Sequence, residues 1–157
     1  MQKSDGMNYA PQGKPRPVCG ENEFVFAAAA LDHGHIYGMC NGLIEAGATL
    51  KYVFDSDPER VSRFCKSFPG VRSVETFDQI LDDAQVRLVA GAAITSERAE
   101  LGMRVMDFGK DYFTDKAPFT TLAQLEKAKD KVIIQVKNTL CIIANVYMLR
   151  VRYLPGN

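Results

Sequence analysis

Residues 24–55 read FVFAAAALDHGHIYGMCNGLIEAGATLKYVFD, and apolar runs alternate there with a segment of helical spacing. The apolar run at 24–29 is typical of a strand that is buried on both faces. Apolar residues then recur at helical spacing over 36–44, and Gly47 predicts the end of that helix. A second apolar run follows at 50–54. This succession of strand, helix and strand predicts the first unit of a parallel sheet.

The same alternation continues along the chain. Further strands are expected at 71–74, 86–94 and 112–114, and further helices at 58–68, 77–81, 99–106 and 122–131. The pattern predicts an α/β protein with a Rossmann-type, doubly wound parallel sheet in a single domain. In such sheets ligands bind at the carboxyl ends of the strands, so the loops that follow the strands are the places to search.

The two ends of the chain differ from this domain, which is expected to span residues 23–131. Residues 1–22 mix proline with glycine, lysine and glutamine without any period, which predicts a disordered tail. Residues 132–157 are rich in Ile, Val, Tyr and Arg but lack clean alternation. Within them, residues 132–136 could add a strand at the edge of the sheet.

Composition narrows the function classes. The chain has 157 residues, which suits one domain, and its 19 basic and 19 acidic residues give no sign of a nucleic-acid partner. No apolar run is long enough to cross a membrane and no signal peptide is evident, so a cytoplasmic location is expected. The four cysteines form no CxxC pair, and Cys40 and Cys65 are expected on helices as small buried hydrophobes. The oligomeric state stays open.

The loop after the first strand, residues 30–35, is the first candidate site. Dinucleotide-binding folds usually carry GxGxxG here, so that a pyrophosphate reaches the N-terminus of the next helix. In this chain the matching positions hold Ala30, Asp32 and His35. Asp32 could instead cap the helix, since its charge is unfavourable beside a phosphate. His33 and His35 could donate to phosphate oxygens, whereas a metal site there lacks an evident third ligand.

The candidate cofactor-binding residues of this loop are therefore Ala30, Leu31, Asp32, His33 and His35.

Asp55 is the stronger signal, because it closes the second strand and lies 25 residues beyond Ala30. An acidic residue at about this distance from the glycine loop accepts hydrogen bonds from the adenosine ribose. Its charge would repel a ribose phosphate, which favours NAD over NADP. Residues 55–58 also suit a turn in which Asp57 caps the next helix. Both interpretations can hold, since different aspartates carry them.

Two further loops follow strands at the same edge of the sheet. Thr95 and Ser96 follow the strand at 86–94, where they either line a cofactor groove or, in the case of Ser96, cap the next helix. Asp115 and Lys116 follow the next strand. A lysine beside a carboxylate at a strand end predicts a group that orients a substrate hydroxyl or stabilises developing charge.

Taken in order, these residues resemble the Gfo/Idh/MocA family, which comprises glucose–fructose oxidoreductases, inositol dehydrogenases and rhizopine-catabolism proteins. The likeness runs from about Phe24 to Lys129 and is carried by residues 31–38, 55–60 and 109–118. The last segment, GKDYFTDKAP, is similar to the family's GKHVLVEKP strand and loop, with an aspartate in place of the glutamate and an inserted alanine.

The resemblance implies a Rossmann domain that binds NAD or NADP and hydride transfer at a carbon of a sugar or polyol. It places Lys116 near the substrate hydroxyl as the candidate catalytic residue, and it adds Arg60 and Asp115 to the cofactor-binding candidates. Family members continue into a second domain that carries the other catalytic residues, so this chain alone is expected to be inactive. The alternative, which the altered first loop favours, is a non-catalytic nucleotide-sensing or protein-binding module.

The end of the chain does not resemble the family. Read in a shifted frame from Gln135, with permitted codons, it becomes similar to the family's continuation into the second domain. The hypothesis is therefore that residues 132–157 are a frameshift product, which the sequence of the coding DNA would test.

Overall fold

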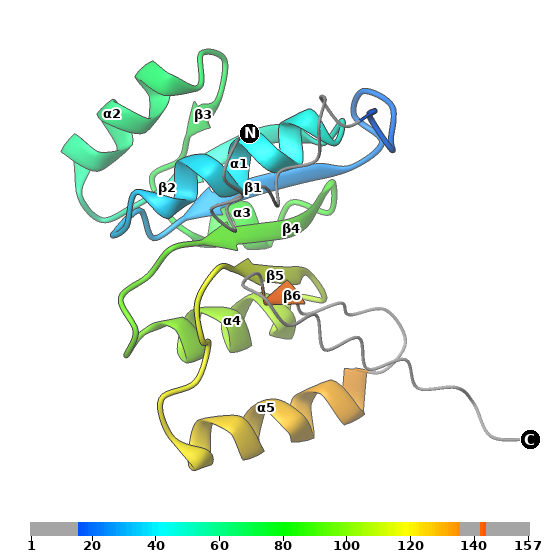
Figure 1. Ribbon diagram of the computed structural model, residues 1–157, viewed down its shortest axis with the longest axis vertical. Helices are drawn as coiled ribbons and strands as arrows, with labels where there is room; N and C mark the ends of the chain where they lie inside the picture. The colour runs from blue at the N-terminus through cyan, green and yellow to red at the C-terminus, as the bar shows by residue number, and fades with distance from the viewer. Residues whose placement is uncertain (1–15, 136–141, 144–157) are drawn as a thin grey trace, which may run out of the picture.

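The computed structural model describes residues 16–135 and 142–143 (Figure 1). Within this part of the chain, one sheet holds six strands in the order β3-β2-β1-β4-β5-β6. The strands are β1 (Val25–Ala29), β2 (Thr49–Phe54), β3 (Arg72–Ser73), β4 (Val86–Gly91), β5 (Asp111–Thr114) and β6 (Ile142–Ile143). All neighbouring strands pair in parallel. The predicted doubly wound sheet is confirmed, and its strand order reverses between β1 and β4.

Helices connect the strands and lie along the whole width of the sheet. They are α1 (His35–Glu45), α2 (Pro58–Ser67), α3 (Asp78–Leu81), α4 (Arg98–Asp107) and α5 (Leu122–Gln135). Figure 1 shows α1 and α2 beside the half that contains β1, β2 and β3, and α4 and α5 beside β5. Parallel neighbours need such crossovers, because a short hairpin cannot return the chain to the same end of the sheet.

Helices cover both faces of the sheet, and each face has a separate apolar core. Phe26 and Ala28 of β1 belong to the core that includes side chains of α1 and α2. Val25, Ala27 and Ala29 belong to the core that includes side chains of α3 and α4. Successive side chains of a strand point to opposite faces, so a strand buried on both faces requires the continuous apolar run that the sequence shows.

A close approach between α4 and the sheet depends on glycine. A Cβ atom at Gly102 would lie 2.6 Å from Cδ1 of Tyr112, and one at Gly91 would lie 2.9 Å from Cδ2 of Leu101. Tyr112 of β5 is 2% exposed, so its ring fills the space that these glycines leave. The sequence pattern gave no indication of this contact.

Two predicted helix boundaries are confirmed. Asp57 caps α2 by accepting hydrogen bonds from the amides of Glu59 and Arg60, at 2.8 and 3.4 Å. Gly47 follows α1 with φ of +102°, the left-handed conformation that commonly ends a helix. Both ends therefore form for local reasons that the sequence already contains.

Other boundaries differ from the prediction. The strand expected at 86–94 ends at Gly91, because the backbone beyond it turns into the loop that meets β1, where the Ala92 amide donates to the Ala30 carbonyl. The expectation of an edge strand at 132–136 is wrong for residues 132–135, because these residues continue α5. The strand that pairs with β5 is β6.

Part of the expected N-terminal tail is attached to the domain. The amide of Val18 donates to the carbonyl of Ala46 at 2.8 Å, and the amide of Asn22 donates to Oγ1 of Thr49 at 3.0 Å. The boundary at residue 22 and the frameshift hypothesis stay predictions. Residues 1–15, 136–141 and 144–157, which carry most of both tails, lie outside the described residues.

The cysteine prediction is confirmed for Cys40, while for Cys65 the helix is confirmed and the burial is only partial. Cys40 on α1 is fully buried, and burial raises the pKa of its thiol to about 12. Cys65 on α2 is half-buried against the same core.

Among the residues that the structure describes, no helix combines the length and apolar character that crossing a bilayer requires.

Candidate functional site

The end of β2 is tied directly to the loop that follows β1. Oδ2 of Asp55 accepts a hydrogen bond from the Leu31 amide at 2.6 Å, and Oδ1 accepts one from the Asp57 amide at 2.8 Å. The Asp55 side chain is only 3% exposed. The predicted proximity of Asp55 to the first crossover turn is therefore confirmed, and its carboxylate fixes the shape of that turn.

This burial bears on the predicted contact between Asp55 and a ribose. A carboxylate offers about four lone-pair sites, and backbone amides occupy two of them here. Little of the remaining surface is accessible. Contact between Asp55 and a ribose stays a prediction. In the structure, Asp55 holds the turn after β1 by accepting from the Leu31 amide.

The turn after β1 adopts the backbone shape that glycine usually provides. Ala30 has φ of +53°, in the left-handed region that non-glycine residues rarely adopt. Its amide donates to the carbonyl of Phe54 at 3.2 Å, which holds it in place. Gly34 is the N-cap of α1 and makes no side-chain cap, and a Cβ atom at Gly34 or Gly38 would meet nothing within 4 Å. The N-terminus of α1 therefore borders open space, as an anion site requires.

Asp32 does not cap α1, so that alternative is wrong. Its Oδ1 atom lies 2.5 Å from Nη1 of Arg60, which α2 carries in its first turn. The same guanidinium lies 3.3 Å from Oδ2 of Asp57 and 3.7 Å from Oδ1 of Asp55. The hydrogen bond to Asp32, with the three nearby carboxylates, raises the pKa of Arg60 above its ordinary value. Arg60 thus offsets much of the charge that made Asp32 unfavourable beside a phosphate.

The loops after β1 and β5 meet at a cluster of three side chains. Nδ1 of His35 lies 3.2 Å from Oδ2 of Asp115, and Nζ of Lys116 lies 3.6 Å from the same oxygen. Asp115 is 14% exposed, while Lys116 and His35 are 37% and 53% exposed. A mostly buried carboxylate therefore holds two groups that remain accessible. The structure brings three of the predicted site residues together here.

The remaining predicted residues are exposed and less constrained. Thr95 and Ser96 lie on the loop between β4 and α4, and both are exposed. The N-cap of α4 is Glu97, so the expectation that Ser96 could cap this helix is wrong. His33 is also exposed, with its ring centre 6.4 Å from that of His35. Among the described side chains, no group of three His, Cys, Asp or Glu residues could hold a metal ion.

Arg98 is a residue of this edge that sequence reasoning missed. It is 5% exposed; its Nε donates to the carbonyl of Ala93 at 2.8 Å and its Nη1 to that of Ala117 at 3.4 Å. It therefore ties the loop after β4 to the loop that carries Lys116. An arginine after a glutamate and before an apolar stripe gives no sequence signal of such burial.

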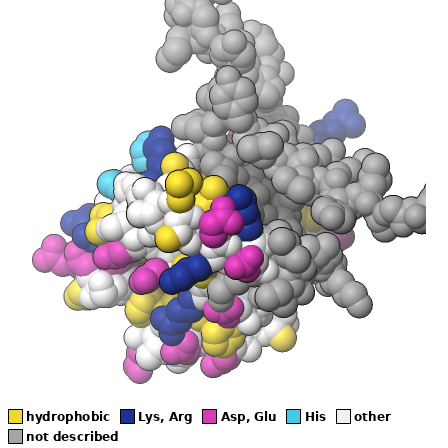
Figure 2. Space-filling model, turned by 90° about the horizontal axis from the view of Figure 1, so that it is seen from below, with side chains coloured by type: hydrophobic (Ala, Val, Ile, Leu, Met, Phe, Trp, Pro, Cys, Tyr) yellow, Lys and Arg dark blue, Asp and Glu magenta, His cyan; other side chains and the backbone are white. Residues whose placement is uncertain are grey.

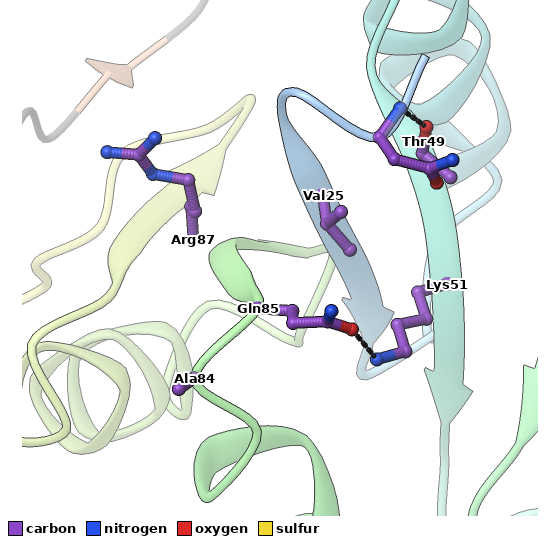
Figure 3. Close-up of a pocket in the computed structure, with 7 residues that line it drawn as sticks. Val25, Thr49, Lys51, Ala84, Gln85 and Arg87 are labelled. Atoms are coloured by element: carbon purple, nitrogen blue, oxygen red, sulfur yellow. Dashed lines mark hydrogen bonds between the residues drawn. The ribbon is translucent and has the colours of Figure 1, made fainter.

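A cavity of about 540 Å³ lies at the opposite edge, by the amino ends of β1, β2 and β4 (Figure 3). In this cavity, Nζ of Lys51 donates to Oε1 of Gln85 and Oδ2 of Asp83, at 2.6 Å each. These contacts join β2 to the segment before β4. The cavity is thus far along the strands from the cluster of His35, Asp115 and Lys116, and its lysine is already engaged.

The described residues on the face in Figure 2 show no field of a single sign. Figure 2 shows acidic and basic side chains interspersed over the face seen from the α5 side, with histidine side chains at its margin. This agrees with equal numbers of acidic and basic residues in the sequence. The charges of the candidate site therefore act locally, through the pairs described above.

Similar proteins were found among the solved structures. No family model and no curated protein matches the sequence. A solved structure from Erwinia carotovora atroseptica, of a protein assigned as an oxidoreductase, is 42% identical with a TM-score of 0.71, over 76% of this chain and 35% of that one.

Two more distant structures share the fold. The WlbA dehydrogenase of Chromobacterium violaceum, in complex with NADH and UDP-GlcNAcA, is 17% identical with a TM-score of 0.65, over 80% of this chain and 36% of that one. A 3-ketoreductase of Actinomadura kijaniata, in complex with TDP-benzene and NADP, is 15% identical with a TM-score of 0.65, over 77% of this chain and 38% of that one.

This chain thus spans about a third of the length of each of these proteins. The strand order of this chain, β3-β2-β1-β4-β5-β6, is that of the Rossmann-type sheet that the sequence indicated. The solved structures that share this fold are oxidoreductases of the Gfo/Idh/MocA type, and the described residues of this chain form a Rossmann-type domain similar to theirs.

Proposed function

We propose that this chain is the nicotinamide-dinucleotide-binding domain of an oxidoreductase that acts on CH–OH groups of sugars or polyols. The observation that carries the proposal is the convergence of three loops at the carboxyl edge of the sheet. The turn held by Asp55, the open N-terminus of α1 and the Asp115–Lys116 pair all lie there. Ligands of doubly wound sheets bind at this edge, where the strand order reverses.

The residues present suit a dinucleotide. The left-handed backbone at Ala30 and the open space around Gly34 let a pyrophosphate approach the amides at the start of α1. The ribose would lie by the end of β2, near Asp55 and Arg60. His33 and His35, which are exposed at this turn, are the further groups that could donate to phosphate oxygens. When bound, the dinucleotide supplies the hydride acceptor or donor.

Lys116 is the proposed catalytic residue. Its side chain is 37% exposed and its Nζ lies 3.6 Å from Oδ2 of Asp115, so the lysine is held by one partner and can still reach a substrate hydroxyl. A positive group there would stabilise negative charge that develops on the substrate oxygen, or exchange a proton with it. Arg98 supports this position, because it binds the carbonyl of the adjacent Ala117.

The relatives support the choice of substrate class. One is in complex with NADH and a sugar nucleotide, and another is a 3-ketoreductase in complex with NADP. Because this chain spans about a third of their length, turnover of a sugar or polyol is proposed for a protein that includes further residues.

Calorimetric titration of the full chain with NADH tests the proposal. We expect saturable binding that the Asp55→Ala variant loses and the Lys116→Met variant keeps, since Asp55 shapes the turn while Lys116 faces the substrate. Absence of binding to the folded wild-type chain would contradict the proposal.

A panel of polyols incubated with NAD provides the second readout, followed by the absorbance of NADH. Turnover that disappears in Lys116→Met supports the catalytic role of this lysine. In a protein that includes the further residues, binding of NADH without any turnover favours the second candidate function, a non-catalytic nucleotide-sensing module, which the presence of Asp32 at a loop position that is usually glycine also supports.

A further inference from the structure

One guanidinium stands among three carboxylates that come from the two turns that follow β1 and β2. Asp32 lies in the loop after β1, Asp55 ends β2, and Asp57 caps α2. Their oxygens lie 2.5, 3.7 and 3.3 Å from nitrogens of Arg60. We call these four residues the Arg60 cluster. It lies where a doubly wound fold places the adenosine ribose of a dinucleotide, at the end of β2 and beside the first turn.

The charge balance of the Arg60 cluster is negative. Three carboxylates surround one guanidinium, which leaves a formal surplus of two negative charges. In folds of this kind an arginine near the end of the second strand can accommodate the 2′-phosphate of NADP. Arg60 is at that position, but its Nη1 faces Asp32 and Asp55, and its Nε faces Asp57. A phosphate would therefore meet an arginine whose donors are largely engaged.

Asp32 is the member of the cluster that holds Arg60 most closely. It stands at a position that is usually glycine in dinucleotide-binding turns, and glycine would leave the guanidinium without this partner. Asp55 is turned toward two backbone amides, and Asp57 is turned toward the amides of α2. Within the part of the chain that the structure describes, the hydrogen bond of the Asp32 carboxylate is the one that it accepts from Arg60.

We propose that the pairing of Asp32 with Arg60 makes the site select NADH over NADPH. This inference rests on the proposed function, since it concerns the same dinucleotide. Binding of a 2′-phosphate requires Arg60 to exchange a charge-assisted bond with Asp32 for one with the phosphate, against the repulsion of the remaining carboxylates. NADH carries no phosphate at that position and requires no exchange.

The test compares dissociation constants for NADH and NADPH in the full-length chain and its Asp32→Asn variant. The amide keeps the shape of the side chain but removes its charge. We expect the wild-type chain to prefer NADH, and we expect the preference to shift toward NADPH by about tenfold in the variant, which corresponds to about 1.4 kcal/mol. Asp32→Gly, which restores the usual residue of the turn, should shift it in the same direction.

Two controls separate the pairing from a general change of charge. Asp78→Asn removes a carboxylate from another ion pair, 2.6 Å from Nη2 of Arg104, on the face covered by α3 and α4. It should leave the preference unchanged. The double variant Asp32→Asn with Arg60→Ala should lose the gain for NADPH, because the group that reads the phosphate is then absent. Circular dichroism confirms that each variant is folded.

The outcomes distinguish this inference from the proposed function. A folded wild-type chain that binds neither dinucleotide overturns both. A chain that binds NADPH as tightly as NADH overturns only the inference, as does an unchanged preference in both Asp32 variants. A shift that persists in the double variant also overturns it, because Arg60 would then not be the responsible group.

Discussion

Two lysines flank β5, and they differ in burial and in the groups that they contact. Lys110 precedes the strand, is 5% exposed, and donates from Nζ to the carbonyls of Asp83 and Val86 at 2.6 and 2.9 Å. Burial lowers its pKa below the ordinary value. Lys116 follows the strand, is 37% exposed, and lies 3.6 Å from Asp115. One lysine completes the hydrogen bonding of the backbone, and the other remains accessible to a ligand.

The difference extends to the two edges of the sheet. At the amino edge, Lys51 and Lys110 bind side chains and carbonyls of the segment before β4, so their donors are engaged within the domain. At the carboxyl edge, the N-terminus of α1 has no side-chain cap, and Lys116 and His35 share one carboxylate. Charged side chains alone therefore do not identify a binding site. A site needs polar groups that the fold positions but does not fully use.

Removal of Lys110 should have the largest effect on stability. Lys110→Ala leaves the carbonyls of Asp83 and Val86 without their donor, at a cost of about 3 kcal/mol in the free energy of unfolding. Lys116→Ala, the matched control at the other end of β5, should change it by less than about 0.5 kcal/mol. Urea unfolding measures both. Equal losses in the two variants would remove the contrast between the lysines.

The packing of β5 between the two lysines provides the next test. Gly102→Ala places a Cβ atom 2.6 Å from the ring of Tyr112 and should destabilise the domain by about 2 kcal/mol, because the core has no room for it. Gly42→Ala on α1 is the control, since a Cβ atom there meets nothing within 4 Å. It should stabilise by about 0.5 kcal/mol. Thermal unfolding that showed no difference between the variants would contradict this account of the contact.

Asp55→Asn tests whether the carboxyl edge is also held by structure. The asparagine side chain has one oxygen where aspartate has two, so either the Leu31 amide or the Asp57 amide loses its acceptor. We expect a loss of about 1 kcal/mol in the free energy of unfolding. We also expect the Leu31 amide to exchange its hydrogen with solvent faster than in the wild-type chain. The exposed Asp130→Asn on α5 serves as the control for the change of charge. Unaltered exchange at Leu31 would show that Asp55 does not hold the turn.

The smallest expected effect concerns the acid stability of the amino edge. The hydrogen bond from Lys51 lowers the pKa of Asp83 from 3.8 to about 2. Since the folded-state pKa is the lower one, this pair stabilises the fold above about pH 4, and the contribution disappears as the pH falls toward 2. For a partly exposed pair it amounts to about 1 kcal/mol or less. Lys51→Met should flatten this part of the stability curve, and an unchanged curve would contradict the assignment.

Much of the fold could be predicted because the signals are local. The run at 24–29 is apolar at every position, which a strand buried on both faces needs. Asp57 caps the start of α2 with its side chain, and Gly47 follows the end of α1 in a left-handed conformation. The expectations that failed were also local: Asp32 and Ser96 suit a cap, yet Gly34 and Glu97 hold those positions. Several residues can satisfy one local rule, and tertiary contacts select among them.

The amino-acid sequence was enough to predict the succession of strands and helices along the chain and the edge of the sheet that holds the candidate site. Periodicity of apolar residues sets the elements, and parallel strands must end at a common edge. Only the tertiary structure decided which polar groups meet there: Asp32 with Arg60, His35 with Asp115, and Arg98 with the carbonyl of Ala117. Each of these contacts joins a helix to a loop that is distant from it in the chain. Their distances depend on how the crossovers pack, which no local pattern records.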